Sequence, residues 1–166
     1  MTDVRPTPKP FDFATWYPGM RQRTPDWDFQ QEDTPVWAPL QKPLAQCTIA
    51  MVCTAGVHLR SQDPFDTGPR GDVTFREIPG DVNPADLMIT HAAYDHSDAD
   101  RDINCVFPIE RLRELAAEGV IGGLASSHFA MMGRVPSAGA VRKIVLPTIT
   151  EAVQRVAPDA VFLTCG

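Results

Sequence analysis

Two of the four histidines lie close to four aspartates within fourteen residues, from His91 to Asn104. The other two, His58 and His128, each follow a different predicted strand. Imidazole and carboxylate groups transfer protons and bind substrates or metal ions. In open α/β sheets, ligands bind beyond the carboxyl ends of the strands. The placement of all four histidines beside strand ends therefore predicts a functional site.

Two cysteines lie at the ends of predicted apolar strands. Cys53 ends one strand and precedes Thr54 and Gly56, and Cys165 follows the last strand. A thiolate is a strong nucleophile, and backbone amides or an imidazole can activate it. Glycine allows a ligand to approach the backbone closely. We predict that both thiols are catalytic and that Thr54 and Gly56 bind substrate; a buried structural thiol and a frayed terminal residue are the alternatives.

The acidic block also has the spacing of a metal site. His91, Asp95 and His96 give His-x-x-x-Asp-His, which is similar to the His-x-His-x-Asp-His of metallo-β-lactamase hydrolases with Ala93 in place of the second histidine. Such ligands suit zinc or iron. The alternative is an acidic loop in which Asp95 or Asp98 caps a turn. His91 and His96 are also predicted to be catalytic without a metal.

The remaining candidates are polar side chains in predicted loops that could bind a small anionic substrate. Arginine suits a carboxylate because it makes two parallel hydrogen bonds to it. The substrate-binding candidates of this kind are His58, Arg60, Asp95, Asp98 and His128, and Arg76 and Arg101 are further guanidiniums.

Composition narrows the class of protein. The 166 residues suit one domain, and 43% of them are apolar. A net charge of −6 without a basic cluster argues against a nucleic-acid partner. No apolar run approaches the roughly 20 residues of a membrane span, and the N-terminus lacks the apolar segment of a signal peptide. We expect a cytoplasmic protein whose four cysteines are thiols rather than disulfides.

The amino-acid composition and the pattern of apolar residues change near residue 47. Residues 1–46 hold eight of the sixteen prolines and all three tryptophans. Proline opposes long helices, so we predict an extended arm that packs its tryptophans on this protein or on a partner. Residues 47–166 alternate short apolar runs with amphipathic stretches and form the predicted α/β domain.

The α/β domain is predicted to contain a mostly parallel sheet flanked by helices, of the Rossmann or flavodoxin type. Strands are predicted at 49–52, 73–78, 87–90, 120–125 and 160–163, with the second half-exposed and 87–90 central in the sheet. Helices are predicted at 108–118 and after Ser137, the latter kinked or divided by Pro147. On this prediction six side chains gather at one edge of the sheet: Cys53, His58, His91, His96, His128 and Cys165.

Several segments resemble one protein family, the selenoprotein B subunits of glycine, sarcosine, betaine and D-proline reductases. The resemblance covers residues 34–165. The segments that carry it are Trp37–Leu44, Val52–Leu59, Gln62–Asp66, Gly71–Asp72, Phe75–Pro79, Tyr94–Asn104 and Val106–Pro108.

The resemblance implies reductive cleavage of a C–N bond in a small amino acid or betaine. In the family, a selenocysteine or cysteine near the end of a late strand attacks the substrate carbon, and a second thiol resolves the adduct. Cys165 lies within a residue or two of that position, and the sequence stops at Gly166, before the family's resolving cysteine. A partner subunit can supply a pyruvoyl group. We therefore expect a small-molecule substrate and a homo-oligomer or a complex with another reductase subunit.

Other functions remain open at this point. The His/Asp block could serve a metal-dependent hydrolase or lyase. The chain could instead be a non-catalytic subunit that completes a partner's site. A racemase with Cys53 and Cys165 on either side of the substrate is a further alternative.

Overall fold

The computed structural model describes residues 12–23, 38–69, 71–135 and 137–166, and the chain divides into two units, 1–38 and 39–166. In the first unit, α1 (Phe13–Arg23) is a helix that contains Pro18. Its start is capped by Asp12, whose carboxylate accepts the amide of Ala14 at 3.1 Å. This part of the predicted extended arm is therefore helical. Trp27 and Trp37 lie outside the described residues.

The second unit is built on a mostly parallel sheet, as predicted. Its central strand is β1 (Thr48–Cys53), which pairs in parallel with β6 (Ser127–Met131) on one side and β7 (Ala160–Thr164) on the other. The two-residue β5 (Gly123–Leu124) pairs with the start of β1 on the β6 side. β3 (Phe75–Pro79) lies antiparallel to β6 at one edge. Within the described residues β7 therefore forms the opposite edge.

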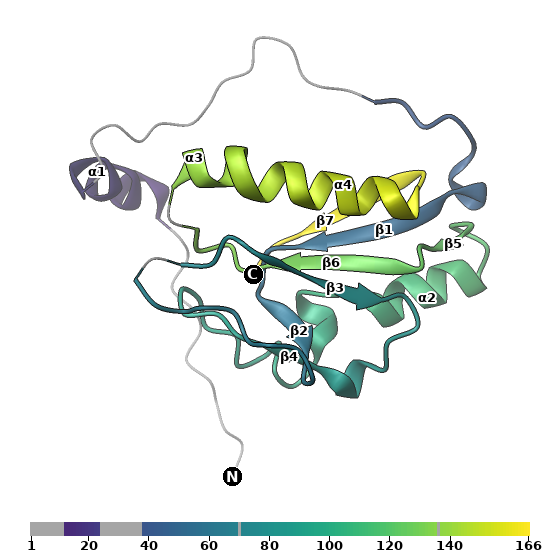
Figure 1. Ribbon diagram of the computed structural model, residues 1–166, viewed down its shortest axis with the longest axis horizontal. Helices are drawn as coiled ribbons and strands as arrows, with labels where there is room; N and C mark the ends of the chain where they lie inside the picture. Colours follow the sequence, from purple (N-terminus) through teal and green to yellow (C-terminus); the bar gives the residue numbers. More distant parts are fainter. Residues whose placement is uncertain (1–11, 24–37, 70, 136) are drawn as a thin grey trace. The chain divides into compact units, whose positions relative to one another are not determined.

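Helices cover both faces of this sheet, with α2 (Ile109–Ala117) on one face and α4 (Leu146–Val156) on the other (Figure 1). α4 follows the short helix α3 (Ala138–Ala140) and a π-helical stretch, η4 (Val141–Val145). Pro147 occupies the first turn of α4, where its missing N–H is tolerated. The helical backbone runs on without a break from Ala138 to Val156, so Pro147 does not divide the helix; the π-helical stretch ends just before it.

A second, two-stranded sheet lies below the first in the view of Figure 1. It consists of β2 (Val57–Leu59) and β4 (Leu87–Ile89), which are antiparallel. The prediction that residues 87–90 form a central strand is wrong. Leu87 and Ile89 are buried, as a central strand requires, but they pack into the core from this small sheet. Burial alone does not distinguish the two arrangements.

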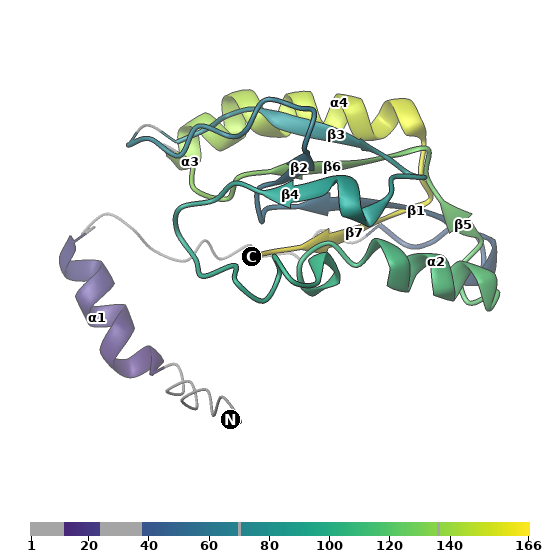
Figure 2. The same ribbon diagram turned by 90° about the horizontal axis from the view of Figure 1, so that it is seen from below.

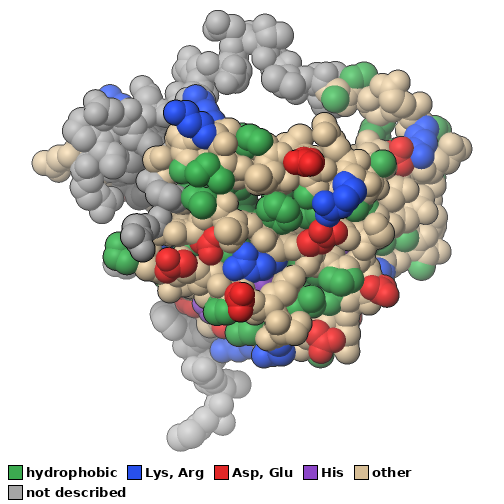
Figure 3. All heavy atoms as spheres, in the orientation of Figure 1, with side chains coloured by type: hydrophobic (Ala, Val, Ile, Leu, Met, Phe, Trp, Pro, Cys, Tyr) green, Lys and Arg blue, Asp and Glu red, His purple; other side chains and the backbone are tan. Residues whose placement is uncertain are grey.

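Three 3₁₀ turns complete the described structure: η1 (Leu44–Gln46), η2 (Pro84–Asp86) and η3 (Ile103–Cys105). Acidic and basic side chains are interspersed on the face seen in Figure 3. No helix among the described residues is long and apolar enough to cross a membrane.

Candidate functional site

Cys53 and Cys165 lie together at the carboxyl ends of neighbouring parallel strands. Cys53 is the last residue of β1 and pairs with Thr164, the last residue of β7. The Thr54 amide continues this contact by donating to the Thr164 carbonyl at 3.1 Å. Cys165 is the next residue and is exposed. The structure therefore places two thiols, one buried and one exposed, at a single strand end.

The Cys53 thiol is fully buried. Its Sγ donates to the Val106 carbonyl at 3.4 Å and accepts the Ala55 amide at 3.3 Å. Burial raises the pKa of Cys53, and the nearby Thr164 hydroxyl and Ala55 amide oppose this only in part. The Thr164 hydroxyl is close enough to Cys53 to influence its pKa. Its Oγ1 is buried and has no hydrogen-bond partner of normal geometry among the described residues. At neutral pH Cys53 is thus a protonated thiol that can donate a proton.

Tyr94 covers the segment that follows β7. A β-carbon on Gly166 would lie 2.7 Å from Tyr94 Cζ and 2.8 Å from Ala55 Cβ, so the backbone there passes directly against both side chains. The Tyr94 hydroxyl donates to the Ala55 carbonyl at 3.1 Å. Burial raises the pKa of Tyr94 to about 12, so the phenol stays neutral. Figure 2 shows the end of β7 beside the loop after β4 that carries Tyr94.

His91 and His96 pack on Tyr94, with ring centroids 4.7 Å and 5.5 Å away. Burial, with smaller effects from His96 and Arg134, lowers the pKa of His91, so this imidazole is neutral at neutral pH and can accept a proton. The His96 Nδ1 bonds the Asp100 carboxylate at 2.8 Å, which fixes the orientation of the ring. Two of the four predicted histidines therefore pack on Tyr94, the side chain that contacts the residue after Cys165.

The aspartates of this loop mainly fold the loop. Asp95 accepts the Ser97 amide at 3.0 Å, and Asp98 pairs with Arg101 at 2.7 Å. The hydrogen bonds from Ser97 lower the pKa of Asp95. These contacts are those of the turn-capping alternative.

The His91, Asp95 and His96 set does not fit a metal ion well. His91 Nδ1 accepts the Ala93 amide at 3.0 Å, His96 Nδ1 bonds Asp100, and Asp95 bonds Ser97. No group of three or more His, Cys, Asp and Glu in the described part of the chain is arranged to hold a metal ion. The zinc or iron site stays a prediction, and no step below depends on it.

His58 and His128 do not join this site, so the expectation that all four histidines share one edge is wrong. His58 lies in β2, where its ring nitrogens bond the Leu59 carbonyl at 2.7 Å and the Thr90 hydroxyl at 2.8 Å. His128 lies within β6, and its Nδ1 accepts the amide of Met51 at 3.1 Å. Both rings are buried and serve the fold.

His128 replaces a backbone acceptor where the ladder of β1 is interrupted. β1 pairs with β5 through Thr48 and Ile49 and with β6 through Val52 and Cys53, and the amide of Met51 falls between. Nδ1 of His128 accepts that amide, while its buried Nε2 has no partner among the described residues. Burial lowers the pKa of His128 to about 4, with a small contribution from Arg113.

Other predicted binding residues have structural contacts. Gly56 has φ +74°, and a β-carbon there would lie 2.3 Å from the Thr90 carbonyl oxygen, so its close approach is to the protein backbone. The Thr54 carbonyl accepts the Gly133 amide at 2.7 Å. Arg76 stacks over Phe65 at 4.3 Å. Arg60 lines a separate cavity, considered below.

Sequence reasoning missed Tyr94 and Arg134 as site residues. Tyr94 is the aromatic residue of the acidic block, a signal that the analysis of charged residues passed over. Arg134 follows β6, and its charge helps to lower the pKa of His91. Nothing in the sequence around Arg134 indicates that it lies near His91.

Residues 27–166 match the model of the family described as glycine/sarcosine/betaine reductase selenoprotein B. The chain is 40% identical over 132 residues to the D-proline reductase subunit gamma of Acetoanaerobium sticklandii, covering 80% of this chain and 54% of that protein. It is 30% identical over 129 residues to the glycine reductase complex component B subunit gamma of Carboxydothermus hydrogenoformans, covering 76% of this chain and 29% of the relative. The same subunit of Symbiobacterium thermophilum is 29% identical over 161 residues, which cover 92% of this chain and 34% of that protein.

These matches show that the chain belongs to the selenoprotein B family of reductase subunits. The sequence resemblance is thereby confirmed. The chain spans about half the length of the D-proline reductase relative and about a third of the glycine reductase relatives. No solved structure matches it closely.

Proposed function

We propose that this chain is a subunit of a reductase that cleaves a C–N bond in a small amino acid or betaine by thiol chemistry. The observation that carries the proposal is the pairing of Cys53 with Thr164, which sets Cys165 beside a second thiol at the strand end. Family membership supports the reductase class. The names of the relatives, D-proline reductase and glycine reductase, supply the substrate class.

The proposed reaction uses two thiols as the source of two electrons. The Cys165 sulfur attacks the substrate carbon, a C–S bond forms, the C–N bond breaks, and the amine leaves with a proton from a neighbouring acid. A second thiol then attacks the Cys165 sulfur. The S–S bond that forms releases the carbon, which takes a proton and is thereby reduced by two electrons. An external dithiol returns the disulfide to two thiols.

The surrounding groups suit these proton transfers. Because its pKa is lowered, His91 is neutral. It is the residue we propose as the acceptor of the Cys165 proton. Cys53 and Tyr94, both with raised pKa, are proton or hydrogen-bond donors. Arg134, whose charge reaches His91, is the candidate for holding a substrate carboxylate.

The proposal includes assembly with another reductase subunit. Three apolar residues of β7 are solvent-exposed: Val161 is 41% exposed, Phe162 44% and Leu163 72%. It has no charged residue or proline of the kind that usually protects an edge strand. Since the relatives are named as subunits, a strand of a second reductase subunit is the occupant we propose for this edge.

Turnover tests the proposal directly. Release of ammonia from glycine or trimethylamine from betaine, and ring opening of D-proline to 5-aminopentanoate, are measured in the assembled reductase with a dithiol as reductant. Cys165→Ser is expected to abolish turnover, and Cys105→Ser, at another exposed cysteine, is expected to retain it. Full activity of Cys165→Ser would overturn the thiol mechanism and favour a non-catalytic subunit.

A further inference from the structure

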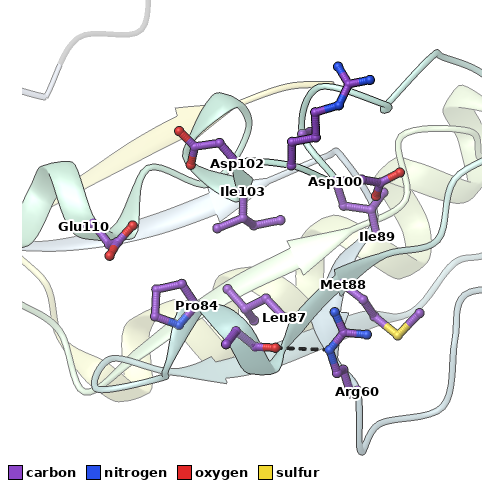
Figure 4. Close-up of a pocket in the computed structure, with 12 residues that line it drawn as sticks. Arg60, Pro84, Leu87, Met88, Ile89, Asp100, Asp102, Ile103 and Glu110 are labelled. Carbon is purple, nitrogen blue, oxygen red and sulfur yellow. Dashed lines mark hydrogen bonds between the residues drawn. The ribbon is translucent and has the colours of Figure 1, made fainter.

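A cavity of about 470 Å³ lies between the β2–β4 sheet and the loop of residues 99–103 (Figure 4). Neither cysteine of the proposed reductase site lines it. Its floor is apolar, because Leu87, Ile89 and Ala99 are all buried. Charged side chains surround this floor. The volume is in the range of small-molecule sites.

Two of the charged residues have partners of their own. Asp100 bonds His96 at 2.8 Å, and Arg101 pairs with Asp98 at 2.7 Å. The charges left to define the cavity are therefore those of Arg60, Asp102 and Glu110.

The two remaining carboxylates are held side by side. The side-chain nitrogen of Asn104 donates to Asp102 at 2.9 Å and to Glu110 at 2.7 Å. Neither carboxylate forms an ion pair within 4.0 Å among the described residues. Hydrogen bonds from Asn104 lower the pKa of Asp102, and Arg111, which pairs with Glu114, has a smaller effect in the same direction. Two adjacent negative charges attract a cation. This end of the cavity therefore suits an ammonium group.

Arg60 supplies the opposite charge at the other end. Its Nε donates to the Ala85 carbonyl at 3.1 Å, which fixes the guanidinium and leaves its two terminal nitrogens to bind an anion. In Figure 4, Arg60 lies at the lower right, Asp102 and Glu110 lie at the left, and Leu87 and Ile103 lie between.

We propose that this cavity binds a small zwitterion whose ammonium and carboxylate groups are separated by an apolar chain, as in an ω-amino acid. The ammonium binds Asp102 and Glu110, the carboxylate binds Arg60, and the methylene groups pack on Leu87 and Ile103. This site is distinct from the proposed reductase site and does not require Cys165.

Calorimetric titration with 6-aminohexanoate tests the proposal, with hexanoate, hexylammonium and glycine as comparison ligands. We expect saturable binding with a Kd of about 1 mM or tighter. Each half-charged analogue is expected to bind about 10-fold more weakly, because it leaves one charged end unpaired. Glycine is expected to bind weakly, since its charges are too close to reach both ends. No binding of 6-aminohexanoate, or equal binding of hexanoate, would overturn the proposal.

Variants locate the site. Arg60→Gln and Glu110→Gln are each expected to weaken binding about 10-fold. Arg101→Gln is the matched control, because Arg101 lines the same cavity but is already paired with Asp98. Unchanged binding in Arg60→Gln would refute the assignment. Cys165→Ser is expected to bind normally, so a failure of the reductase mechanism leaves this result interpretable.

Discussion

The ring of Tyr94 lies against the backbone of Gly166, and a β-carbon at that position would stand 2.7 Å from Cζ. This contact connects the acidic loop after β4 with the end of β7. The Tyr94 ring also packs against His91 and His96, so one aromatic side chain contacts both these histidines and the residue that follows Cys165.

Replacing Gly166 with alanine is expected to disturb this contact. The added β-carbon must displace Tyr94 or Ala55, so Cys165 should change its rate of alkylation by iodoacetamide several-fold. Gly139→Ala is the control, because its β-carbon would meet only the Ser137 hydroxyl at 3.7 Å. Equal alkylation rates in both variants and the parent would show that the Tyr94 contact does not position Cys165.

Tyr94→Phe is expected to lower the free energy of unfolding by about 1 kcal/mol, since the Ala55 carbonyl loses its hydrogen bond. The ring, and with it the packing on Gly166, is retained. Urea denaturation measures the change. A loss above about 3 kcal/mol would mean that the hydroxyl supports more than this one bond.

Protonation of His128 is expected to destabilise the protein in mild acid. Its pKa is about 4 in the folded protein and about 6.5 when unfolded, so the unfolded chain binds the extra proton between these values. The free energy of unfolding is therefore highest above pH 6.5. It falls as the pH decreases to 4, by at most about 3 kcal/mol. His91, whose pKa is also lowered, adds a smaller effect of the same sign.

Urea denaturation between pH 7 and pH 4 measures this dependence. His128→Gln is expected to be less stable at pH 7 and to show a shallower decrease with acid. His96→Gln is the control, because the His96 side chain is partly exposed. The same slope in His128→Gln as in the parent protein would contradict the assignment of the acid effect to His128.

The exposed edge of β7 is expected to control assembly. Leu163→Asp changes a side chain that is 72% exposed, so folding should be little affected. Binding to a partner subunit should fall at least about 10-fold, because a charge would be buried in the interface. Sedimentation of the mixed subunits measures this. Glu118→Gln, at an exposed position outside the edge, is the control, and unchanged assembly of Leu163→Asp would place the interface elsewhere.

Much of the fold could be predicted, because apolar periodicity reports burial. β1, β7 and α2 were predicted from their apolar residues, whereas the helix at Pro147 continues without a break and only changes from π-helical to α-helical winding. The pairing of β4 could not be predicted, since Leu87 and Ile89 are buried in either sheet. The signal for α1 was Asp12, whose capping role was overlooked beside the many prolines.

The site was predicted only where its residues follow strand ends. Cys53 and Cys165 meet because parallel strands end at the same edge. His128 was misplaced because its strand lies later in the chain than the predicted 120–125, at Ser127–Met131, so His128 falls inside it. The buried ring accepts the amide of Met51. The contact between Tyr94 and Gly166 depends on how a long loop folds back, which local sequence does not encode.

The reactivity of Cys165 tests the central claim most directly. Iodoacetamide is added at pH 7, and the modified cysteines are followed by mass spectrometry of peptides. Cys165 should react about 10-fold faster than Cys105, since both are exposed and the proposed mechanism assigns His91 as the acceptor of the Cys165 proton. His91→Gln should remove the difference. Equal rates at Cys165 and Cys105 in the parent protein would contradict a catalytic thiol at this strand end.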